Sequence, residues 1–300
     1  VHLVYGANYV IAKGVMPDVI GPSGFVMARI LGAVCLFWII FAFKWERVAR
    51  KDLILLFICS VLGIVTNQVL FLNGLNLTSP INASLIMITI PISVFILSII
   101  FFKEKVTTRK VLGIILGSVG FATLVVLSNE SSKSASLKGD ILCMINAISY
   151  AGYLVLIKTL MGKYRALTIL SWLFLFGSIL IIPIGYEQFM VVEWSELSKL
   201  HLFSILYVVI AVTFVVYFLN IYALNYITPT KVSAFTYLQP IFAGVFAFLY
   251  YMIVSSFDPE VSNYASDITL TKVISAIIIF VGVYLVSFEG KKQIGNAMPK

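Results

Sequence analysis

Charged residues are scarce in this chain of 300 residues, where Asp, Glu, Lys and Arg together make up 11%. A soluble domain of similar size carries about a quarter charged residues, so this sequence lacks the polar surface that water requires. Apolar and aromatic residues make up 61%, and the mean hydropathy is +1.05. The composition excludes a soluble globular protein and indicates a chain embedded in a membrane.

Residues suited to catalysis and metal binding are also few. His2 and His201 are the only histidines, and Cys35, Cys59 and Cys143 form no CxxC pair. No cluster of His, Cys and carboxylate residues has the spacing of a metal site, and no glycine-rich phosphate loop occurs. We therefore expect no metal, no cofactor and no use of ATP by this chain.

Apolar runs bounded by Gly, Pro or charged residues predict ten transmembrane helices, since a span needs about 20 residues. The runs are residues 1–16, 23–43, 53–73, 80–102, 110–127, 139–160, 167–186, 201–224, 229–253 and 271–288. Because the chain begins in apolar sequence, we expect the first helix to lack its natural start. The later spans argue against a cleaved signal peptide.

Lysine and arginine are distributed unevenly between the predicted loops, which sets the orientation. With the N-terminus in the cytoplasm, 15 of the 21 cations fall on the cytoplasmic side: four within 44–51, four within 103–110, three within 158–165, Lys231, and three within 291–300. The outer side holds Lys133, Lys138, Lys199 and Lys272. We predict a multi-pass protein of the plasma or inner membrane with both termini cytoplasmic. The net charge of +8 follows from this topology and indicates no nucleic-acid partner.

The two halves of the chain resemble each other, which indicates an internal repeat. After a shift of 149 residues, six identities fall within 18 aligned positions: Leu75-Asn76, Pro80, Ser84 and Pro91-Ile92. Near the start, a shift of 145 places Tyr5 on Tyr150, Val10 on Val155 and Lys13 on Lys158. Near the end, a shift of 162 places Lys110 on Lys272.

The repeat divides the chain into a first five-helix half at 1–127, a linker at 128–138, a second half at 139–290 and a cytoplasmic tail at 291–300. Because five is odd, the second half enters the membrane from the opposite side. The expected fold is an all-α membrane protein of about ten transmembrane helices in two inverted five-helix repeats. This arrangement is common among alternating-access transporters.

The fourth and ninth predicted spans begin alike, with Ser79-Pro80 and Thr228-Pro229. In each, a hydroxyl residue precedes a proline at the first helical position. Eleven residues further on, each span has a second proline, Pro91 or Pro240. A proline inside a helix removes a backbone hydrogen bond and bends the helix. We interpret the two prolines as bends that shape a central cavity, and the alternative is a kink that serves packing alone.

These motifs follow one another in a recognisable order. They are Gly6-Ala7-Asn8 with Lys13, Arg29, the run Gly74-Leu75 to Thr78 and Pro80, Phe102-Lys103-Glu104-Lys105, Gly113 and Gly120. In this order the chain resembles, over essentially its whole length, the EamA-type permeases of the drug/metabolite transporter superfamily. The resemblance implies ten helices in two inverted repeats and the export or exchange of metabolites such as amino acids. One departure is that Glu104 has no counterpart near Met252.

Polar side chains inside apolar spans are candidates for a substrate pathway. Six predicted helices carry such side chains, and in each helix they fall on a single face. The residues are Tyr5, Asn8, Asn67, Asn82, Thr89, Asn146, Tyr150, Tyr153, Tyr217, Asn220, Ser233, Thr236 and Tyr237. Each alone is typical of a hydrogen bond between helices. Together they predict a polar and aromatic cavity between the halves, with the more uniformly apolar spans facing lipid or a partner subunit.

Lys13 and Arg29 are the cations inside the predicted spans. Both lie near predicted outer ends, where long side chains can extend to the membrane surface. The alternative is that Lys13 contacts a carboxylate or another anionic group of the substrate, so it is included among the candidate cavity residues. Gly113, Gly117 and Gly120 form a small-residue face, suited to packing within the monomer or to contact in a homodimer.

The function that these features favour is a secondary transporter, an exporter or exchanger of small organic metabolites. Amino acids or related amphipathic compounds are the expected small-molecule substrates, carried across the lipid bilayer by alternating access. A polytopic membrane enzyme acting on lipid-like substrates is the alternative, although the carboxylates here are scattered, and a channel is a further one. We expect no enzymatic activity.

Proton coupling is also not expected, because none of the 13 acids falls in the middle of a predicted span. Proton-driven exporters place a carboxylate within the bilayer, where it can exchange a proton for substrate. Transport is therefore predicted to follow the substrate gradient, or to exchange solutes, without obligatory proton antiport. Asp140, at the start of the sixth span, is the acid whose depth tests this expectation.

Overall fold

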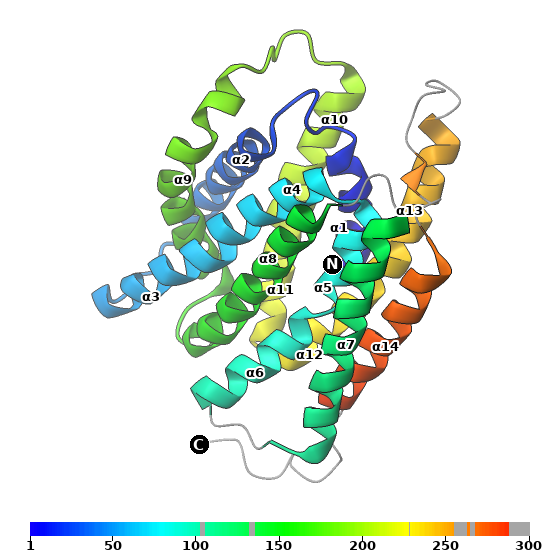
Figure 1. Ribbon diagram of the computed structural model, residues 1–300. Helices are drawn as coiled ribbons and strands as arrows, with labels where there is room; N and C mark the ends of the chain where they lie inside the picture. The colour runs from blue at the N-terminus through cyan, green and yellow to red at the C-terminus, as the bar shows by residue number, and fades with distance from the viewer. Residues whose placement is uncertain (103–105, 132–135, 228, 255–262, 265–267, 288–300) are drawn as a thin grey trace.

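The chain folds into a bundle of helices (Figure 1). The structure is a computed structural model that describes residues 1–102, 106–131, 136–227, 229–254, 263–264 and 268–287. Within these residues the regular secondary structure is helical. The predicted tail 291–300, residues 132–135 of the predicted linker 128–138, and residues 103–105 around Glu104 lie outside the described residues.

The first half of the chain begins with α1 and ends with α7. Its elements are α1 (His2–Lys13), α2 (Pro22–Ala42), α3 (Arg50–Ser60), the π-helical turn η1 (Val61–Thr66), α4 (Asn67–Leu77), α5 (Pro80–Met87), α6 (Ile90–Phe102) and α7 (Thr108–Ser131). The segments α3, η1 and α4 follow one another without a break and form one long helix.

The second half repeats this order of elements. They are α8 (Leu137–Ile157), the 3₁₀ turn η2 (Lys158–Leu160), α9 (Ala166–Met190), α10 (Lys199–Tyr207), the π-helical turn η3 (Val208–Val215), α11 (Val216–Leu224), α12 (Pro229–Ala234), the 3₁₀ turn η4 (Phe235–Tyr237), α13 (Leu238–Val254) and α14 (Leu270–Ser287). Here α10, η3 and α11 form the long helix that corresponds to α3, η1 and α4.

Six helical stretches are long and apolar enough to cross a membrane: Pro22–Ala42, Arg50–Leu77, Pro80–Phe101, Leu137–Leu160, Ala166–Met190 and Lys199–Leu224. Leu238–Ile253 and Leu270–Gly282 are shorter apolar helices. Each of the ten predicted ranges contains helix in the described part of the chain. The first and fifth ranges, which these eight stretches do not cover, hold α1 and α7. The all-helical membrane fold is therefore confirmed, while the count of ten spans and their inversion stay predictions.

The fourth and ninth predicted spans are both interrupted just before their second proline. Helix α5 ends at Met87 and α6 begins at Ile90, one residue ahead of Pro91, while the 3₁₀ turn η4 precedes Pro240. Proline has no N–H for the carbonyl four residues earlier and clashes with it. At the first break the Ile86 carbonyl accepts from both the Thr89 hydroxyl at 2.7 Å and the Thr89 backbone N–H at 3.0 Å, one residue before the Met87 carbonyl that Pro91 leaves without its helical donor.

Two helix pairs lie at opposite sides of the bundle, α2 against α9 and α7 against α14 (Figure 1). The glycine face of α7 is used in the second pair. A Cβ atom built on Gly282 of α14 would lie 2.6 Å from both the Gly113 carbonyl oxygen and the Gly117 nitrogen. Because the two backbones touch there, this face packs within the chain rather than being left for a homodimer.

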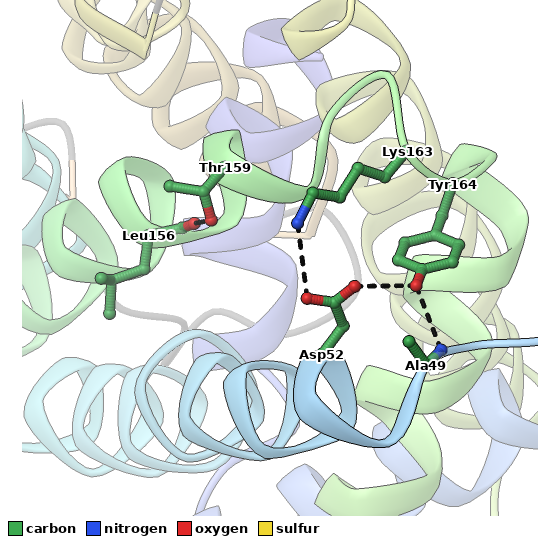
Figure 2. A network of polar contacts seen from close by, with 6 residues as sticks. All are labelled: Ala49, Asp52, Leu156, Thr159, Lys163 and Tyr164. Carbon is green, nitrogen blue, oxygen red and sulfur yellow. Dashed lines mark hydrogen bonds and ion pairs between the residues drawn. The ribbon is translucent and has the colours of Figure 1, made fainter.

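A network of polar contacts joins the start of α3 to the loop between η2 and α9 (Figure 2). The Tyr164 hydroxyl donates to Asp52 Oδ2 at 2.8 Å and accepts from the Ala49 backbone N–H at 3.1 Å. Lys163 Nζ lies 3.4 Å from Asp52 Oδ1. Beside this network, Glu46 accepts from the Arg165 backbone N–H and the Thr168 hydroxyl at the start of α9. Segments from the two halves are therefore tied together at this end of the bundle.

Two lysines that begin predicted spans, and that the charge count assigns to the membrane surfaces, are buried. Lys272, predicted on the outer side, lies in the first turn of α14 with 1% of its surface exposed. Lys110, predicted in a cytoplasmic loop, lies in the first turn of α7 with its Nζ 4.3 Å from the centre of the Phe95 ring. The predicted boundaries place both lysines in the helices, but the sequence does not show that their side chains are buried.

Candidate functional site

A pocket lies at the centre of the bundle, between helices of both halves, and is called the central pocket here. Its walls are Tyr5, Asn8, Tyr9, Arg29, Asn67, Gln68, Phe71, Met87, Ile90, Asn146, Tyr150, Tyr217 and Gln239. The cavity volume is about 60 Å³, which is room for a few water molecules. A larger molecule therefore requires the helices to separate.

The long helices place Gln68 and Tyr217 against each other across the pocket. Each side chain follows a π-helical turn, η1 or η3, which widens the helix and changes the face on which later residues point. Gln68 Nε2 donates to the Tyr217 hydroxyl at 3.4 Å. The hydroxyl of Tyr217 in turn lies 3.2 Å from the Gly63 carbonyl oxygen and from Asn67 Oδ1, both of them acceptors.

Asparagines link the other helices to this centre. Asn67 Nδ2 donates to Asn146 Oδ1 at 3.2 Å, and Asn146 Nδ2 donates to the Asn67 carbonyl at 2.9 Å. Asn220 Nδ2 donates to the hydroxyls of Tyr5 and Tyr150 at 3.5 and 3.4 Å. These hydroxyl and amide groups therefore form two hydrogen-bonded sets at the pocket, and within each set the members restrain the orientation of their neighbours.

Another hydrogen-bonded pair in the wall connects α1 to α13. The Tyr9 hydroxyl donates to Gln239 Oε1 at 2.7 Å, and Gln239 Nε2 lies 3.1 Å from His2 Nδ1. The ring of Tyr9 packs edge-on against Phe71, with centroids 5.4 Å apart. This side of the pocket thus combines one polar anchor with an aromatic surface.

Arg29 brings a positive charge into the pocket wall. It lies two turns inside α2, is 3% exposed and donates from Nε to the Thr213 hydroxyl of η3 at 3.0 Å. The interpretation that it extends to the membrane surface is therefore wrong, because its guanidinium turns inward to the neighbouring helix. Its Nη1 has no hydrogen-bond partner, and neither have Asn8 Oδ1 and Gln68 Oε1 in the same wall.

Six of the predicted cavity residues line the central pocket: Tyr5, Asn8, Asn67, Asn146, Tyr150 and Tyr217. Asn220 lies directly behind them through its bonds to the two tyrosines. The sequence could identify them because a polar side chain at regular helical spacing in an apolar span is rare.

Other predicted residues point elsewhere. Lys13 donates from Nζ to the carbonyl oxygens of Leu75, Asn76 and Thr78 at 2.8, 2.6 and 3.1 Å, where α4 ends. Buried Asn82 and Ser233 lie outside the pocket wall, and the Ser233 hydroxyl donates to its own helix.

Thr89 and Tyr153 are also outside the wall. Thr89 lines a separate groove with Ile92, Ser93 and Met144, and Tyr153 packs on η1, where a Cβ at Gly63 would lie 2.3 Å from its ring. The side chain of Tyr237 lies outside the described part of the chain. Helix breaks and π-helical turns rotate these faces, and a fixed helical period cannot follow such rotations.

Sequence reasoning missed several wall residues. The sequence places Arg29 near the membrane surface, and the predicted cavity residues do not include Gln68 and Gln239, although both are polar residues inside apolar spans. Tyr9, Phe71, Met87 and Ile90 carry no signal that distinguishes them from ordinary core residues. The signal for Gln68 and Gln239 is present in the sequence, because both are amides inside apolar spans.

The groups in this wall are suited to binding an organic molecule. The polar groups of the wall are hydroxyls, amides and one guanidinium, and aromatic rings with Met87 and Ile90 supply the apolar surface. Among the described residues, no group of three or more His, Cys, Asp or Glu side chains is placed to hold a metal ion. Such a pocket can hold and orient an organic molecule through hydrogen bonds and ring contacts.

Comparison with known proteins identifies one family twice within the chain. The sequence profile of the EamA-like transporter family matches residues 1–126 and again residues 137–255. A solved crystal structure has the same fold, with a TM-score of 0.62 across 95% of this chain and 94% of that one, at 11% sequence identity.

Two curated relatives are described as an uncharacterized transporter and as a WAT1-related protein. A protein of Archaeoglobus fulgidus described as an uncharacterized transporter is 34% identical over 46% of this chain and 48% of its own length. A WAT1-related protein of Arabidopsis thaliana is 27% identical over 70% of this chain and 62% of its own length. The chain therefore matches about half of the first relative and less than two thirds of the second.

Proposed function

Because the chain belongs to the EamA-like transporter family and is therefore a membrane transporter, we propose that it is a secondary transporter of small amphipathic organic molecules. The substrate binds in the central pocket between the two halves. Access to the pocket alternates between the two sides of the membrane, as expected for inverted repeats. We propose that the protein either exports its substrate or exchanges one solute for another.

The observation that carries this proposal is the meeting of equivalent residues at the pocket. Gln68 and Tyr217 occupy the same position in the two halves under the 149-residue shift, and Gln68 donates to Tyr217. Tyr5 and Tyr150 correspond under the 145-residue shift, and both accept from Asn220. A pocket on the axis between two similar halves can be opened by either half, which alternating access requires.

The packing of the helices supports an inverted repeat of five spans each. Helix α1 packs against α13 as its equivalent, α8, packs against α6, and the pairs α2 with α9 and α7 with α14 join corresponding elements. The π-helical turns η1 and η3 also coincide under the 149-residue shift. We propose halves at 1–127 and 139–290 joined by a linker, with both termini in the cytoplasm of a cell whose plasma or inner membrane holds the protein.

The proposal is tested by transport into proteoliposomes, screening labelled amino acids and nucleosides with and without an unlabelled counter-solute inside. Saturable, protein-dependent uptake of at least one class is expected. Asn146→Trp, which fills the pocket, should abolish this uptake. The matched control Ile145→Trp changes a neighbour on the outer face of the same helix, 45% exposed, and should retain it. Equal transport by both variants would place the pathway elsewhere.

A further inference from the structure

Arg29 holds a positive charge in the central pocket that the described residues do not neutralise. It forms no ion pair with a described carboxylate, and the groups that act on it electrostatically are the hydroxyls of Tyr5 and Tyr217. An arginine stays protonated in proteins. A buried charge without a counter-ion costs free energy. Binding of an anion beside Arg29 would offset this cost.

The donor geometry of Arg29 indicates which anion fits. Thr213 occupies Nε, and Nη1 is buried without a partner. A guanidinium group presents its donors in a planar fork that matches the two oxygens of a carboxylate. One carboxylate that reaches Nη1 would therefore satisfy the unpaired donor and the unpaired charge together.

Two further unpaired groups in the same wall are acceptors. Asn8 Oδ1 and Gln68 Oε1 have no hydrogen-bond partner, and the two residues are 1% and 2% exposed. Leaving a buried acceptor unsatisfied costs free energy. A ligand that carries an N–H or O–H donor beside its carboxylate would satisfy these oxygens while its carboxylate contacts Arg29.

We propose that the central pocket binds a small organic acid, through a carboxylate on Arg29 and an adjacent N–H or O–H donor on Asn8 and Gln68. This inference rests on the proposed function and names the substrate class of the same pocket. It excludes purely cationic amines, because among the described wall residues there is a guanidinium and no carboxylate. The aromatic wall accommodates the apolar remainder of the molecule.

The test measures ligand-induced thermal stabilisation of the purified full-length protein, which does not depend on transport. The probes are alanine, lactate, phenylalanine and phenyllactate, with alaninol and phenylalaninol as amines of matched size that lack the carboxylate. Wild type should bind one or more of the acids roughly tenfold to a hundredfold more tightly than the matched amine. Arg29→Gln should remove that difference, and Arg29→Lys should keep part of it.

A matched control and a second variant separate binding from folding. Arg47→Gln makes the same change at an exposed residue and should leave binding unchanged. Arg29→Met removes a buried unpaired charge, so the ligand-free variant should unfold at the same or a higher temperature than wild type, while losing the response to acids. Acids that stabilise Arg29→Gln as well as wild type, or wild type that prefers the amines or responds to no acid, would overturn the proposal.

The two proposals fail in different ways. Uptake of a neutral or cationic solute that persists in Arg29→Gln would leave the transporter and its pocket intact and refute the carboxylate site. Acid binding that depends on Arg29, without uptake or exchange of any bound acid in proteoliposomes, would support the site and refute secondary transport through it.

Discussion

Lys13 and Lys158 make the same contact in the two halves of the chain. Lys13 donates to the carbonyls of Leu75, Asn76 and Thr78 at the end of α4, and Lys158 donates to those of Leu224 and Ile227 at the end of α11. The lysines correspond under the 145-residue shift, and Leu75 corresponds to Leu224 under the 149-residue shift. The last carbonyls of a helix lack partners within it, so each lysine fixes the end of a pocket-forming helix.

Lys13→Met and Lys158→Met are each expected to lower the unfolding temperature of the purified protein by about 3–10 °C. The reason is that buried carbonyls at a helix end lose a charged donor, while methionine keeps the apolar length of the side chain. Lys44→Met, at an exposed position, serves as the control and should change little. If either Lys13 or Lys158 could be replaced without a shift in unfolding temperature, its contacts would not stabilise the helix end.

The contact between α7 and α14 makes a second prediction. Gly282→Ala places a methyl group where the Gly113 carbonyl oxygen and the Gly117 nitrogen are 2.6 Å away, so the helices must move apart. The expected loss is about 1–3 kcal/mol, seen as a lower unfolding temperature in detergent.

Gly244→Ala is the matched control for this substitution. Its added methyl would have the Ile268 Cδ1 atom as nearest neighbour at 3.6 Å, an ordinary contact. Alanine also favours helix over glycine by about 0.5–1 kcal/mol, so this variant should be neutral or slightly more stable. A Gly282→Ala protein as stable as the control would argue against the tight packing of α7 on α14.

The third prediction concerns the network around Asp52. We expect the Tyr164 hydroxyl to stabilise this loop more than the ion pair between Lys163 and Asp52 does. Tyr164 is held by Asp52 and by the Ala49 N–H, whereas Lys163 is 52% exposed at 3.4 Å from the carboxylate. Exposed ion pairs contribute about 0–1 kcal/mol. Tyr164→Phe should therefore increase hydrogen exchange in residues 46–52 more than Lys163→Met does. Hydrogen exchange is measured by mass spectrometry. A larger increase in Lys163→Met than in Tyr164→Phe would show that the ion pair is the main contact that stabilises the loop.

The sequence predicted much of the fold because each helix is an apolar run that ends at a proline, glycine or charge. The interruption before Pro91 and the N-cap at Ser79, whose side chain accepts from the Asn82 N–H at 3.2 Å, both follow from local chemistry. What no local rule contains is the rotation that η1 and η3 introduce into the long helices. Those π-helical turns bring Gln68 to Tyr217, and they depend on packing between distant segments.

The candidate site was therefore predicted only in part. Tyr5, Asn67 and Tyr217 stand out as polar groups in apolar runs, and they do line the pocket. The sequence does not determine the depth of the Arg29 guanidinium, because a long cationic side chain near a helix end can reach either the membrane surface or the interior. Its partner, Thr213 of η3, is 184 positions away in sequence, so only the tertiary structure decides between the two.

Asp140 is deeper than a loop position. It lies in the first turn of α8, is 1% exposed, accepts from the Thr78 hydroxyl at 2.7 Å and is electrostatically attracted by Lys272 of α14. This environment suits either a proton-exchanging carboxylate or a structural tie between α8 and α14. The structural tie is the favoured hypothesis, because the carboxylate already has a hydroxyl donor in Thr78 and a buried positive charge, Lys272, on the neighbouring helix.

The last prediction is therefore that Asp140 stabilises the fold and does not couple transport to protons. Asp140→Asn should lower the unfolding temperature, because it leaves the buried Lys272 without this negative neighbour, and Asp140→Asn combined with Lys272→Met should recover part of the loss. In proteoliposomes at zero membrane potential, a pH gradient alone should not accumulate substrate in wild type, whereas counter-solute should. Accumulation driven by the pH gradient, absent from Asp140→Asn and from the double variant, would show that this carboxylate carries the proton. Retained exchange activity in the stable double variant, with no response to pH, would establish the structural role.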